Sequence, residues 1–298
     1  MTRTTIALPA RDYGLHATLT SGQAFRWYPV GAGWEGVVNG RWVRLVQRPD
    51  HIKAQTATPH SSWRWLVEYL QTEAYLQPIL ASFPPDKPMR AALRACPGLR
   101  LLRQDPWECL ISFICSSNKQ IVQIQQVLAR LCECFGEPVP VPPGAAPAFA
   151  FPTAARLAAC SETELRTCRM GFRAAYVRAA AQRVSAGDLA LDQLARWPLD
   201  SARRELMQSP GVGPKIADCI LLFAVGQAKA FPLDVWVMRA LREFYFAGRQ
   251  VAPSELREFS AGHFGPFAGY AQQYLFHYMR TKRRLLAKGA DRPARARL

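Results

Sequence analysis

The residues of this chain whose types and spacing could do chemistry are a lysine and an aspartate. Lys215 directly follows the segment 210–214, whose sequence is Pro-Gly-Val-Gly-Pro, and Asp234 comes nineteen residues after the lysine. Two glycines just ahead of an amphipathic stretch indicate a tight hairpin that leads into a helix, and the exposed main-chain N–H groups of such a hairpin can hold a phosphate. A lysine and a carboxylate beside a phosphate cradle favour nucleophilic chemistry on a nucleic acid.

Each of these two residues also has a simpler explanation. Asp234 follows Phe-Pro-Leu at 231–233, where the proline fixes φ, and it precedes an apolar run that predicts a helix over 235–244. Taken alone, Asp234 would be the N-cap of that helix, and Lys215 would be a phosphate contact. A carboxylate at this position can cap the helix and still face the lysine, so the two residues together favour catalysis.

Size and charge limit the classes of protein to which the chain can belong. It has 298 residues, of which 49% are hydrophobic and 20% charged, which is typical of a globular protein with room for two domains. The formal net charge of +16, from 38 basic and 22 acidic residues, favours a polyanionic partner such as DNA or RNA, although a basic enzyme of another kind would share it. The sequence contains no run of about eighteen apolar residues, so we expect no membrane span.

The cysteines and the N-terminus indicate the compartment in which the protein works. The chain begins without the apolar segment of a signal peptide, and its eight cysteines fall mostly on apolar helical faces. Cys132-x-Cys134 is the one close pair, and no histidine stands at zinc-site spacing from it. We therefore expect a reduced, intracellular protein without a metal site, in the cytoplasm or nucleoid of a bacterium or in the nucleus of a eukaryote.

The elements that must position these residues change in kind along the chain. Short β-type runs predict strands over 5–9, 15–19 and 24–30, followed by a hairpin over 37–43 with Asn39-Gly40 in its turn. Residues at helical spacing then predict helices around 65–70, 107–114, 121–131, 203–208, 216–223, 235–244, 253–259 and 270–278. Ser161 with Glu164 forms a capping box that opens one more helix.

This order of elements predicts an α+β fold. We expect a small antiparallel sheet domain over residues 1–103, followed by an all-helical domain over 104–298 that ends in a basic tail. The tail, 282–297, carries seven basic residues against Asp291 alone. It is either a solvated end of the chain or a non-specific contact to phosphates.

Several segments, in order along the chain from about residue 5 to 280, carry a family resemblance. The hairpin segment 206–217 and Pro-Leu-Asp-Val at 232–235 resemble the hairpin and aspartate of the helix-hairpin-helix (HhH-GPD) DNA glycosylases. Ser-Gly-Gln-Ala-Phe-Arg-Trp at 21–27 resembles the N-terminal signature of the 8-oxoguanine DNA glycosylase branch, and 101–109 with 113–118 resembles its central signature. The resemblance implies a sheet domain followed by an HhH-GPD catalytic domain.

The resemblance implies roles for the positions that match. Lys215 would attack the C1′ carbon of the sugar and form a Schiff base, and Asp234 would stabilise the cationic sugar and assist proton transfers. Gly211, Val212 and Gly213 would form the hairpin that binds a DNA phosphate.

The resemblance further implies a pocket for a base extruded from the duplex. Phe276 would stack on the base, Gln272 would read its Watson–Crick edge, and Cys219 would line the pocket. Gly22 would offer its main-chain carbonyl to the extra N7–H of the oxidised purine, which requires a close approach that glycine permits. Without the resemblance, Phe276 would be a core residue and Gly22 a turn residue.

Other matching positions face the opposite strand, and here the chain departs from the family pattern. Asn118, which could otherwise simply end its helix, would contact the orphaned cytosine, and Arg173 would help to read it. Phe172 stands in place of a tyrosine wedge, and Trp236 in place of a histidine beside the aspartate. Gln123 stands in place of an arginine that reads the opposite strand, which weakens the expected preference for cytosine opposite the lesion.

The resemblance therefore implies a bifunctional DNA glycosylase and AP lyase that removes 8-oxoguanine from duplex DNA. We expect a monomer. We expect no cofactor, because the amine supplies the nucleophile, and no iron–sulfur cluster, because the cysteine run that holds the cluster of endonuclease III relatives does not occur after the aspartate. Two alternatives stay open. One is a monofunctional glycosylase for alkylated bases, and the other is a non-catalytic DNA-binding module built on the hairpin.

Overall fold

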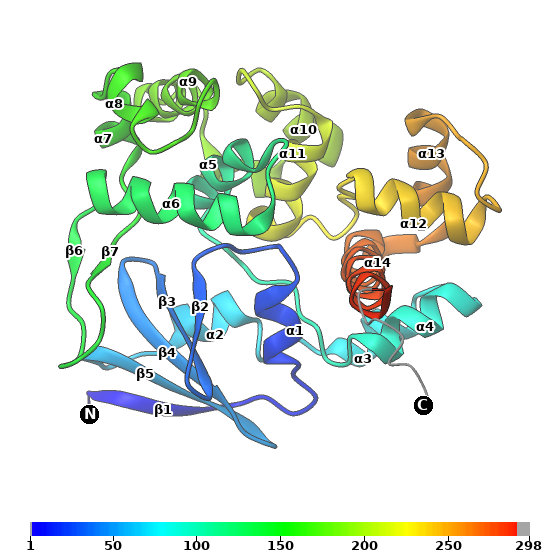
Figure 1. The fold of residues 1–298 in the computed structure, drawn as a ribbon, viewed down its shortest axis with the longest axis horizontal. Helices are drawn as coiled ribbons and strands as arrows, with labels where there is room; N and C mark the ends of the chain where they lie inside the picture. Colours follow the sequence, from blue (N-terminus) through cyan, green and yellow to red (C-terminus); the bar gives the residue numbers. More distant parts are fainter. Residues whose placement is uncertain (1, 291–298) are drawn as a thin grey trace, which may run out of the picture.

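The N-terminal part of the chain forms a five-stranded antiparallel sheet. The computed structural model describes residues 2–290, and side chains as far as residue 282. The strands are β1 (Arg3–Pro9), β2 (Trp27–Val30), β3 (Gly33–Val38), β4 (Arg41–Gln47) and β5 (His51–His60). They lie in the order β1-β5-β4-β3-β2, and most of the helices gather on the other side of the molecule (Figure 1). The predicted α+β class is confirmed.

The hairpin between β3 and β4 forms as its turn residues predict. Val38 pairs with Arg41, which leaves Asn39 and Gly40 as a two-residue turn. Their φ angles are 48° and 71°, the left-handed region that such a turn requires and that asparagine and glycine tolerate best.

The strand predicted over 15–19 is wrong. These residues form helix α1 (Leu15–Thr20), whose buried residues are Leu15, Thr18 and Leu19. Leu15 and Leu19 fit both an alternating pattern and a helical one, and a segment of five residues is too short for the sequence to distinguish the two periods.

Three helices link the sheet to the rest of the chain, and they divide between two hydrophobic cores. They are α2 (Arg64–Leu70), α3 (Leu76–Ala81) and α4 (Lys87–Ala95). Leu66 of α2 packs with the sheet, whereas Leu76 of α3 and Met89 of α4 belong to the core of the helical part. The domain boundary after residue 103 stays a prediction, since α3 and α4 precede it and pack with elements that follow it.

Ten α-helices follow in the described part of the chain and form the helical domain. They are α5 (Pro106–Ser116), α6 (Ile121–Phe135), α7 (Ala154–Ala158), α8 (Glu162–Arg166), α9 (Arg173–Ala186), α10 (Leu199–Met207), α11 (Pro214–Ile220), α12 (Val235–Tyr245), α13 (Pro253–His263) and α14 (Ala268–Ala290). Short strands β6 (Pro138–Val139) and β7 (Ala148–Phe149) pair between α6 and α7. The predicted capping box is present, since the Glu164 N–H donates to Ser161 Oγ at 3.2 Å.

Helix α14 is the element around which the two parts meet. Figure 1 shows it nearly end-on, between α12 and α13 on one side and α3 and α4 on the other, and it contacts α4, α12 and α13. A partly buried ion pair adds a second connection, because Arg26 of the sheet domain donates to Glu108 of α5 at 3.0 Å.

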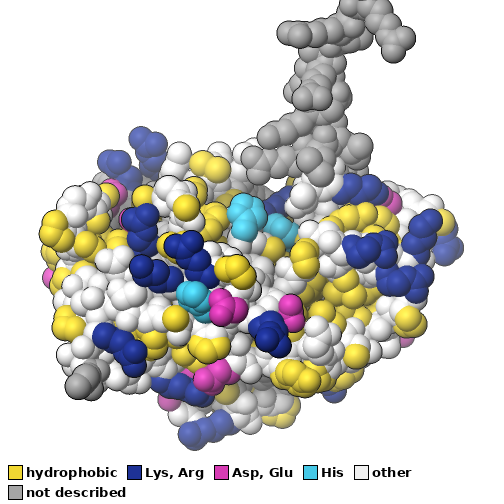
Figure 2. Space-filling view, turned by 90° about the horizontal axis from the view of Figure 1, so that it is seen from below, with side chains coloured by type: hydrophobic (Ala, Val, Ile, Leu, Met, Phe, Trp, Pro, Cys, Tyr) yellow, Lys and Arg dark blue, Asp and Glu magenta, His cyan; other side chains and the backbone are white. Residues whose placement is uncertain are grey.

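The positive charge is dispersed over the face that Figure 2 shows. Figure 2, which views the molecule from below, shows Lys and Arg side chains dispersed among apolar and uncharged ones. None of the helices within residues 2–290 combines the length and the hydropathy that a membrane span requires. Most of the basic tail lies outside the described side chains. Lys282, at its start, pairs with Glu243 of α12 at 2.9 Å.

Candidate active site

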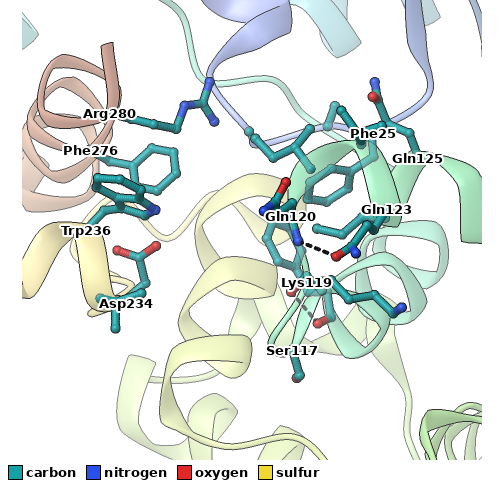
Figure 3. A pocket seen from close by; sticks show the side chains of 18 of the residues that line it. Phe25, Ser117, Lys119, Gln120, Gln123, Gln125, Asp234, Trp236, Phe276 and Arg280 are labelled. Carbon is teal, nitrogen blue, oxygen red and sulfur yellow. Dashed lines mark hydrogen bonds between the residues drawn. The ribbon is translucent and has the colours of Figure 1, made fainter. Parts of the chain in front are cut away.

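The candidate active site is a cleft of about 1670 Å³ between the two parts of the chain. Figure 3 shows its two walls. Asp234, Trp236, Phe276 and Arg280, from α12 and α14, lie on one side, and residues from the α5–α6 turn and the start of α6 lie on the other. Lys215 also lines the cleft.

The hairpin that leads to the lysine is held rigidly by its neighbours. Gly211 has φ of 80°, and a Cβ added there would come within 2.4 Å of the Tyr176 ring, so only glycine fits. Val212 turns its side chain into the core, and its N–H donates to the Ser209 carbonyl at 3.0 Å. Gly213 is the N-cap of α11, so the first N–H groups of that helix have no partner within it.

Lys215 sits on the first turn of α11 and points toward α5. Its Nζ lies 3.4 Å from Ser116 Oγ and 5.2 Å from the centre of the Phe113 ring. The side chain is half-buried, which shields the amine from water on one side and leaves it open to the cleft on the other.

A buried carboxylate that sequence reasoning missed anchors α11. Asp218, fully buried, accepts from Arg203 of α10 at 2.7 Å and from Arg257 of α13 at 3.3 Å. Burial raises the pKa of Asp218, although both arginines act to lower it. One signal in the sequence could have shown it, namely an acidic residue within the apolar run that follows Lys215.

Asp234 occupies the N-cap of α12 and lines the cleft at the same time. Its Oδ1 accepts from the Val237 N–H at 2.8 Å. Burial raises the pKa of this carboxyl, while the Val237 N–H and the nearby charge of Lys215 act in the opposite direction. Asp234 therefore caps α12 and lines the same cleft as Lys215, the combination that the sequence allows.

Gly22 packs directly against α14. Its φ is 80°, and an added Cβ would lie 3.2 Å from the Phe276 ring and 2.9 Å from the Arg280 guanidinium. Two hydrogen bonds from α14 tie down the residues just before the glycine: Gln273 donates to the Ser21 carbonyl at 3.0 Å, and Arg280 donates to the Thr20 carbonyl. Sequence reasoning missed both tethers.

Two predicted pocket residues lie behind the cleft wall rather than on it. Gln272 is buried on α14, and its Oε1 has no hydrogen-bond partner among the described residues. Cys219 is buried on α11, where burial raises the pKa of its thiol to about 12 against the charge of Lys215. Neither residue contributes to the cleft lining, in contrast to Gly22 and Phe276.

The residues predicted to face the opposite strand are only partly brought together. Asn118 lines the cleft with φ of 52°, just after α5 ends. Phe172 is 52% exposed but lies outside the cleft lining, and the Arg173 guanidinium stacks on its ring at 4.4 Å. Arg173 itself is buried and donates to the Ser117 carbonyl, so it supports the turn that carries Asn118.

The two departures from the family pattern, Gln123 and Trp236, both line the cleft. Gln123 Oε1 accepts from the Gln120 N–H at 3.0 Å, which fixes this amide at the start of α6. The Arg239 guanidinium lies 5.4 Å from the centre of the Trp236 ring. Over the described residues, no three histidine, cysteine or acidic side chains are grouped to hold a metal ion.

Comparisons with known proteins agree with the geometry. Residues 5–110 match the family "8-oxoguanine DNA glycosylase, N-terminal domain", and residues 111–264 match "HhH-GPD superfamily base excision DNA repair protein". The N-glycosylase/DNA lyase OGG1 of Arabidopsis thaliana is 32% identical over 93% of this chain and 78% of its own length. A probable N-glycosylase/DNA lyase of Methanothermobacter thermautotrophicus is 29% identical over 92% of this chain and 95% of its own.

Solved structures show the same likeness. MBOgg1 in complex with a low-affinity DNA ligand superposes with a TM-score of 0.89 at 32% identity, and the match covers 95% of this chain and 98% of that one. The Clostridium acetobutylicum 8-oxoguanine glycosylase/lyase, in complex with duplex DNA containing cytosine opposite 8-oxoguanine, gives 0.86 at 28% identity over 93% and 98%. A 3-methyladenine DNA glycosylase of Archaeoglobus fulgidus, at 22% identity and a TM-score of 0.75, shares the fold.

Proposed function

This chain belongs to the 8-oxoguanine DNA glycosylase family of the HhH-GPD superfamily, and from that premise we propose that it removes 8-oxoguanine from duplex DNA and cleaves the strand at the site left behind. One observation carries the proposal. The Lys215 amine and the Asp234 carboxyl share a cleft whose wall is formed by Gly22 against Phe276. That combination joins a nucleophile, a charge-stabilising carboxyl and a stacking platform in one place.

DNA binding begins with the hairpin and the net charge of the protein. The N-terminus of α11, held by Gly213 and its neighbours, offers N–H groups to one phosphate. Lys119, Arg280 and Lys282 add positive charge around the cleft, which Asp234 and Glu243 only partly offset. A base has to leave the duplex to reach Lys215, and Phe172 is exposed where it can fill the gap that the base leaves.

The pocket would read the extruded base through three groups. Phe276 stacks on one face of the base, and the Gly22 carbonyl accepts the N7–H that distinguishes 8-oxoguanine from guanine. Gln272 has a buried oxygen without a partner, and this atom would accept from the N–H groups on the Watson–Crick edge. Cys219 lies beside Lys215 and would close the pocket behind the base.

The chemistry follows from the amine. After it loses a proton, Lys215 Nζ attacks C1′, the bond from C1′ to the base breaks, and the base leaves with the bonding electrons and takes up a proton. The ionised Asp234 stabilises the positive charge that develops on the sugar and can pass protons between the sugar and the base. Opening of the sugar gives a Schiff base, and removal of a C2′ proton then expels the 3′ phosphate by β-elimination.

Two other functions are weighed against this one. A monofunctional glycosylase for alkylated bases would use the aspartate alone to assist the attack of water. Such an enzyme needs no amine in the cleft, so the presence of Lys215 there argues against this function. A non-catalytic binding module would explain the hairpin but not the buried Gln272 beside Phe276 on α14. We further propose that the enzyme acts as a monomer, without a cofactor, inside the cell where the genome lies.

Borohydride trapping tests the proposal. Reduction during turnover of an 8-oxoguanine duplex should fix a covalent adduct between the wild-type protein and DNA, because it converts the Schiff base to a stable amine. Lys215→Gln should give no adduct and no strand cleavage. Lys119→Gln, which removes the same charge from the same cleft, should still give the adduct. An adduct formed by Lys215→Gln would remove the lysine from its assigned role.

A further inference from the structure

Helix α9 presents three side chains along one face, and they reach from the exposed Phe172 to the hairpin before Lys215. Phe172 is the N-cap of α9, Tyr176 comes four residues later, and Arg183 comes seven residues after that. Intervals of four and seven residues correspond to one and two turns, so the three side chains lie on the same side of the helix. The proposed reaction gives Phe172 a part but leaves the half-buried Tyr176 without one.

Tyr176 contacts both Phe172 and the hairpin. The two rings lie 5.9 Å apart with an angle of 77° between their planes, the edge-to-face arrangement that aromatic pairs favour. A Cβ added to Gly211 would lie between 2.4 and 3.0 Å from three atoms of the Tyr176 ring. The Tyr176 ring therefore joins the exposed Phe172 to the hairpin backbone.

Phe172 depends on such neighbours for its position. More than half of this residue is exposed, so packing in the core does not fix the direction of its ring. The Arg173 guanidinium lies 4.4 Å from the centre of the ring, and Arg173 in turn donates to the carbonyls of Met170 and Ser117. Arg173 and Tyr176 thus hold the Phe172 ring from α9 itself.

Arg183 ties the hairpin to α9 independently of Tyr176. Its Nη1 donates to Ser209 Oγ at 2.6 Å, and its Nη2 donates to Glu205 of α10 at 2.9 Å. Ser209 directly precedes the hairpin segment 210–214. The hairpin therefore keeps one attachment to α9 when the contact of Tyr176 is removed.

We propose that Tyr176 is a positioning residue that braces Phe172 against the hairpin. In the proposed function, on which this assignment rests, Phe172 fills the gap left by the extruded base and the hairpin holds a phosphate. Tyr176 fixes the distance between these two contacts to DNA, so the hairpin backs the Phe172 ring as it enters the base stack. Ring atoms make both contacts of Tyr176, so its hydroxyl group is not required.

Two DNA duplexes separate base extrusion from the later chemistry. One carries 8-oxoguanine opposite cytosine, and the other carries an abasic site at the same position, where no base has to be extruded. Tyr176→Leu should lower single-turnover excision of 8-oxoguanine by about 10-fold, the upper end of what one aromatic pair contributes. It should lower strand cleavage at the abasic site by less than about 2-fold, because the hairpin and Lys215 stay in place. Tyr176→Phe keeps the ring and should stay within about 2-fold of wild type on both duplexes.

Two further variants show whether Tyr176 acts through Phe172. Arg183→Met removes the other attachment of the hairpin and leaves the Phe172–Tyr176 pair intact, so it should lower excision and abasic cleavage by a similar factor. In a Phe172→Ala background the ring that Tyr176 supports is gone, so adding Tyr176→Leu should lower excision by less than about 2-fold more. The full factor in both backgrounds would mean that Tyr176 only packs, which overturns the brace.

Excision by the wild-type protein and the effects of the variants answer separate questions. The wild-type protein tests the proposed function by itself, so that function stands even if the brace fails. Excision by Tyr176→Leu at the wild-type rate would overturn the brace, and so would equal losses on the two duplexes. Urea unfolding checks that each variant is folded, and Tyr176→Met, whose flexible side chain fills irregular space, takes the place of Tyr176→Leu if the leucine variant is unfolded.

Discussion

The Asp234 carboxylate accepts a hydrogen bond of 2.8 Å from the Val237 N–H, and this bond joins the stability of a helix to the geometry of the cleft. As the N-cap, the carboxylate satisfies one of the free N–H groups of α12. As part of the cleft wall, it faces the charge of Lys215. The cap fixes the position of the carboxyl without any other side chain having to hold it.

The two contributions of Asp234 can be separated by substitution. Asparagine is as good an N-cap as aspartate, so Asp234→Asn should change the free energy of unfolding by less than about 0.5 kcal/mol. It should lower single-turnover excision of 8-oxoguanine by about 100-fold or more, because the charge that stabilises the sugar cation is lost. Urea unfolding and quenched-flow excision measure the two effects.

Asp234→Ala serves as the matched control for the cap. It should show the same loss of excision and a further loss of about 1 kcal/mol in stability. Full excision by Asp234→Asn would mean that the carboxyl only caps α12.

The contact between Gly22 and α14 makes a second prediction. In Gly22→Ala, a methyl group would meet the Phe276 ring and the Arg280 guanidinium at a backbone conformation with φ of 80°. The loop or α14 has to shift, which misplaces the Gly22 carbonyl. The affinity for duplex DNA with 8-oxoguanine should therefore fall by about 10-fold or more, the usual cost of one lost hydrogen bond. Fluorescence anisotropy at fixed salt measures this affinity, with undamaged duplex as reference.

Gly187→Ala provides the control for backbone strain. Gly187 has φ of 84° at the end of α9, and an added Cβ would meet no atom within 4 Å. This variant should lose stability but keep the affinity for the lesion. Equal affinities for Gly22→Ala and wild type would show that the base does not approach this glycine.

Local chemistry explains which parts of the fold and the site were predictable. The turn at Asn39-Gly40 and the cap at Asp234 depend on residues within a few positions of one another, so the sequence shows them directly. The five residues of segment 15–19 fit both the alternating period of a strand and the period of a helix. Packing against the rest of the sheet domain stabilises the helix. Short ambiguous segments take their structure from tertiary contacts.

Long-range contacts explain which features of the fold and the site could not be predicted from the sequence. Gln273 meets Ser21 from more than two hundred residues away, and Asp218 meets two arginines from two other helices. Neither contact has a local signature, because a buried polar side chain is paired by whatever the fold brings beside it. The inward turn of Arg173 toward Ser117 is of the same kind.

A third prediction concerns stability at low pH. His277 is buried on α14 beside Phe276, and its Nδ1 has no hydrogen-bond partner among the described residues. Burial, with the charges of Arg280 and His16, lowers its pKa to about 4. In the unfolded chain His277 has an ordinary pKa near 6.5, so it binds a proton there before it does in the folded protein. Stability is therefore lost as the pH falls below about 6.5, and this loss levels off below about 4.

His277→Phe removes this titration. Between pH 7 and pH 5, the free energy of unfolding measured with urea should fall by about 2 kcal/mol more for wild type than for the variant. The difference comes from the lowered pKa of His277 in the folded protein. Identical acid losses in wild type and His277→Phe would mean that His277 carries its proton in the folded protein.

The last prediction concerns the base opposite the lesion. Gln123 lines the cleft, but its side-chain oxygen is held by the Gln120 N–H, and Arg173 is turned toward the Ser117 carbonyl. An amide can donate or accept, so it discriminates poorly between bases, whereas an arginine offers only donors. Single-turnover excision of 8-oxoguanine by wild type should therefore vary by less than about 10-fold among the four opposite bases.

Gln123→Arg should raise the preference for cytosine over the other three bases by about 10-fold, because the new guanidinium reaches the acceptors of the orphaned base. Gln126→Arg places the same charge on an exposed position of α6 outside the cleft lining, so it should strengthen binding to every duplex alike. If both variants shifted the four rates by the same factor, the effect would be general attraction to DNA. A strict wild-type preference for cytosine would instead show that Arg173 leaves Ser117 and reads the opposite strand by itself.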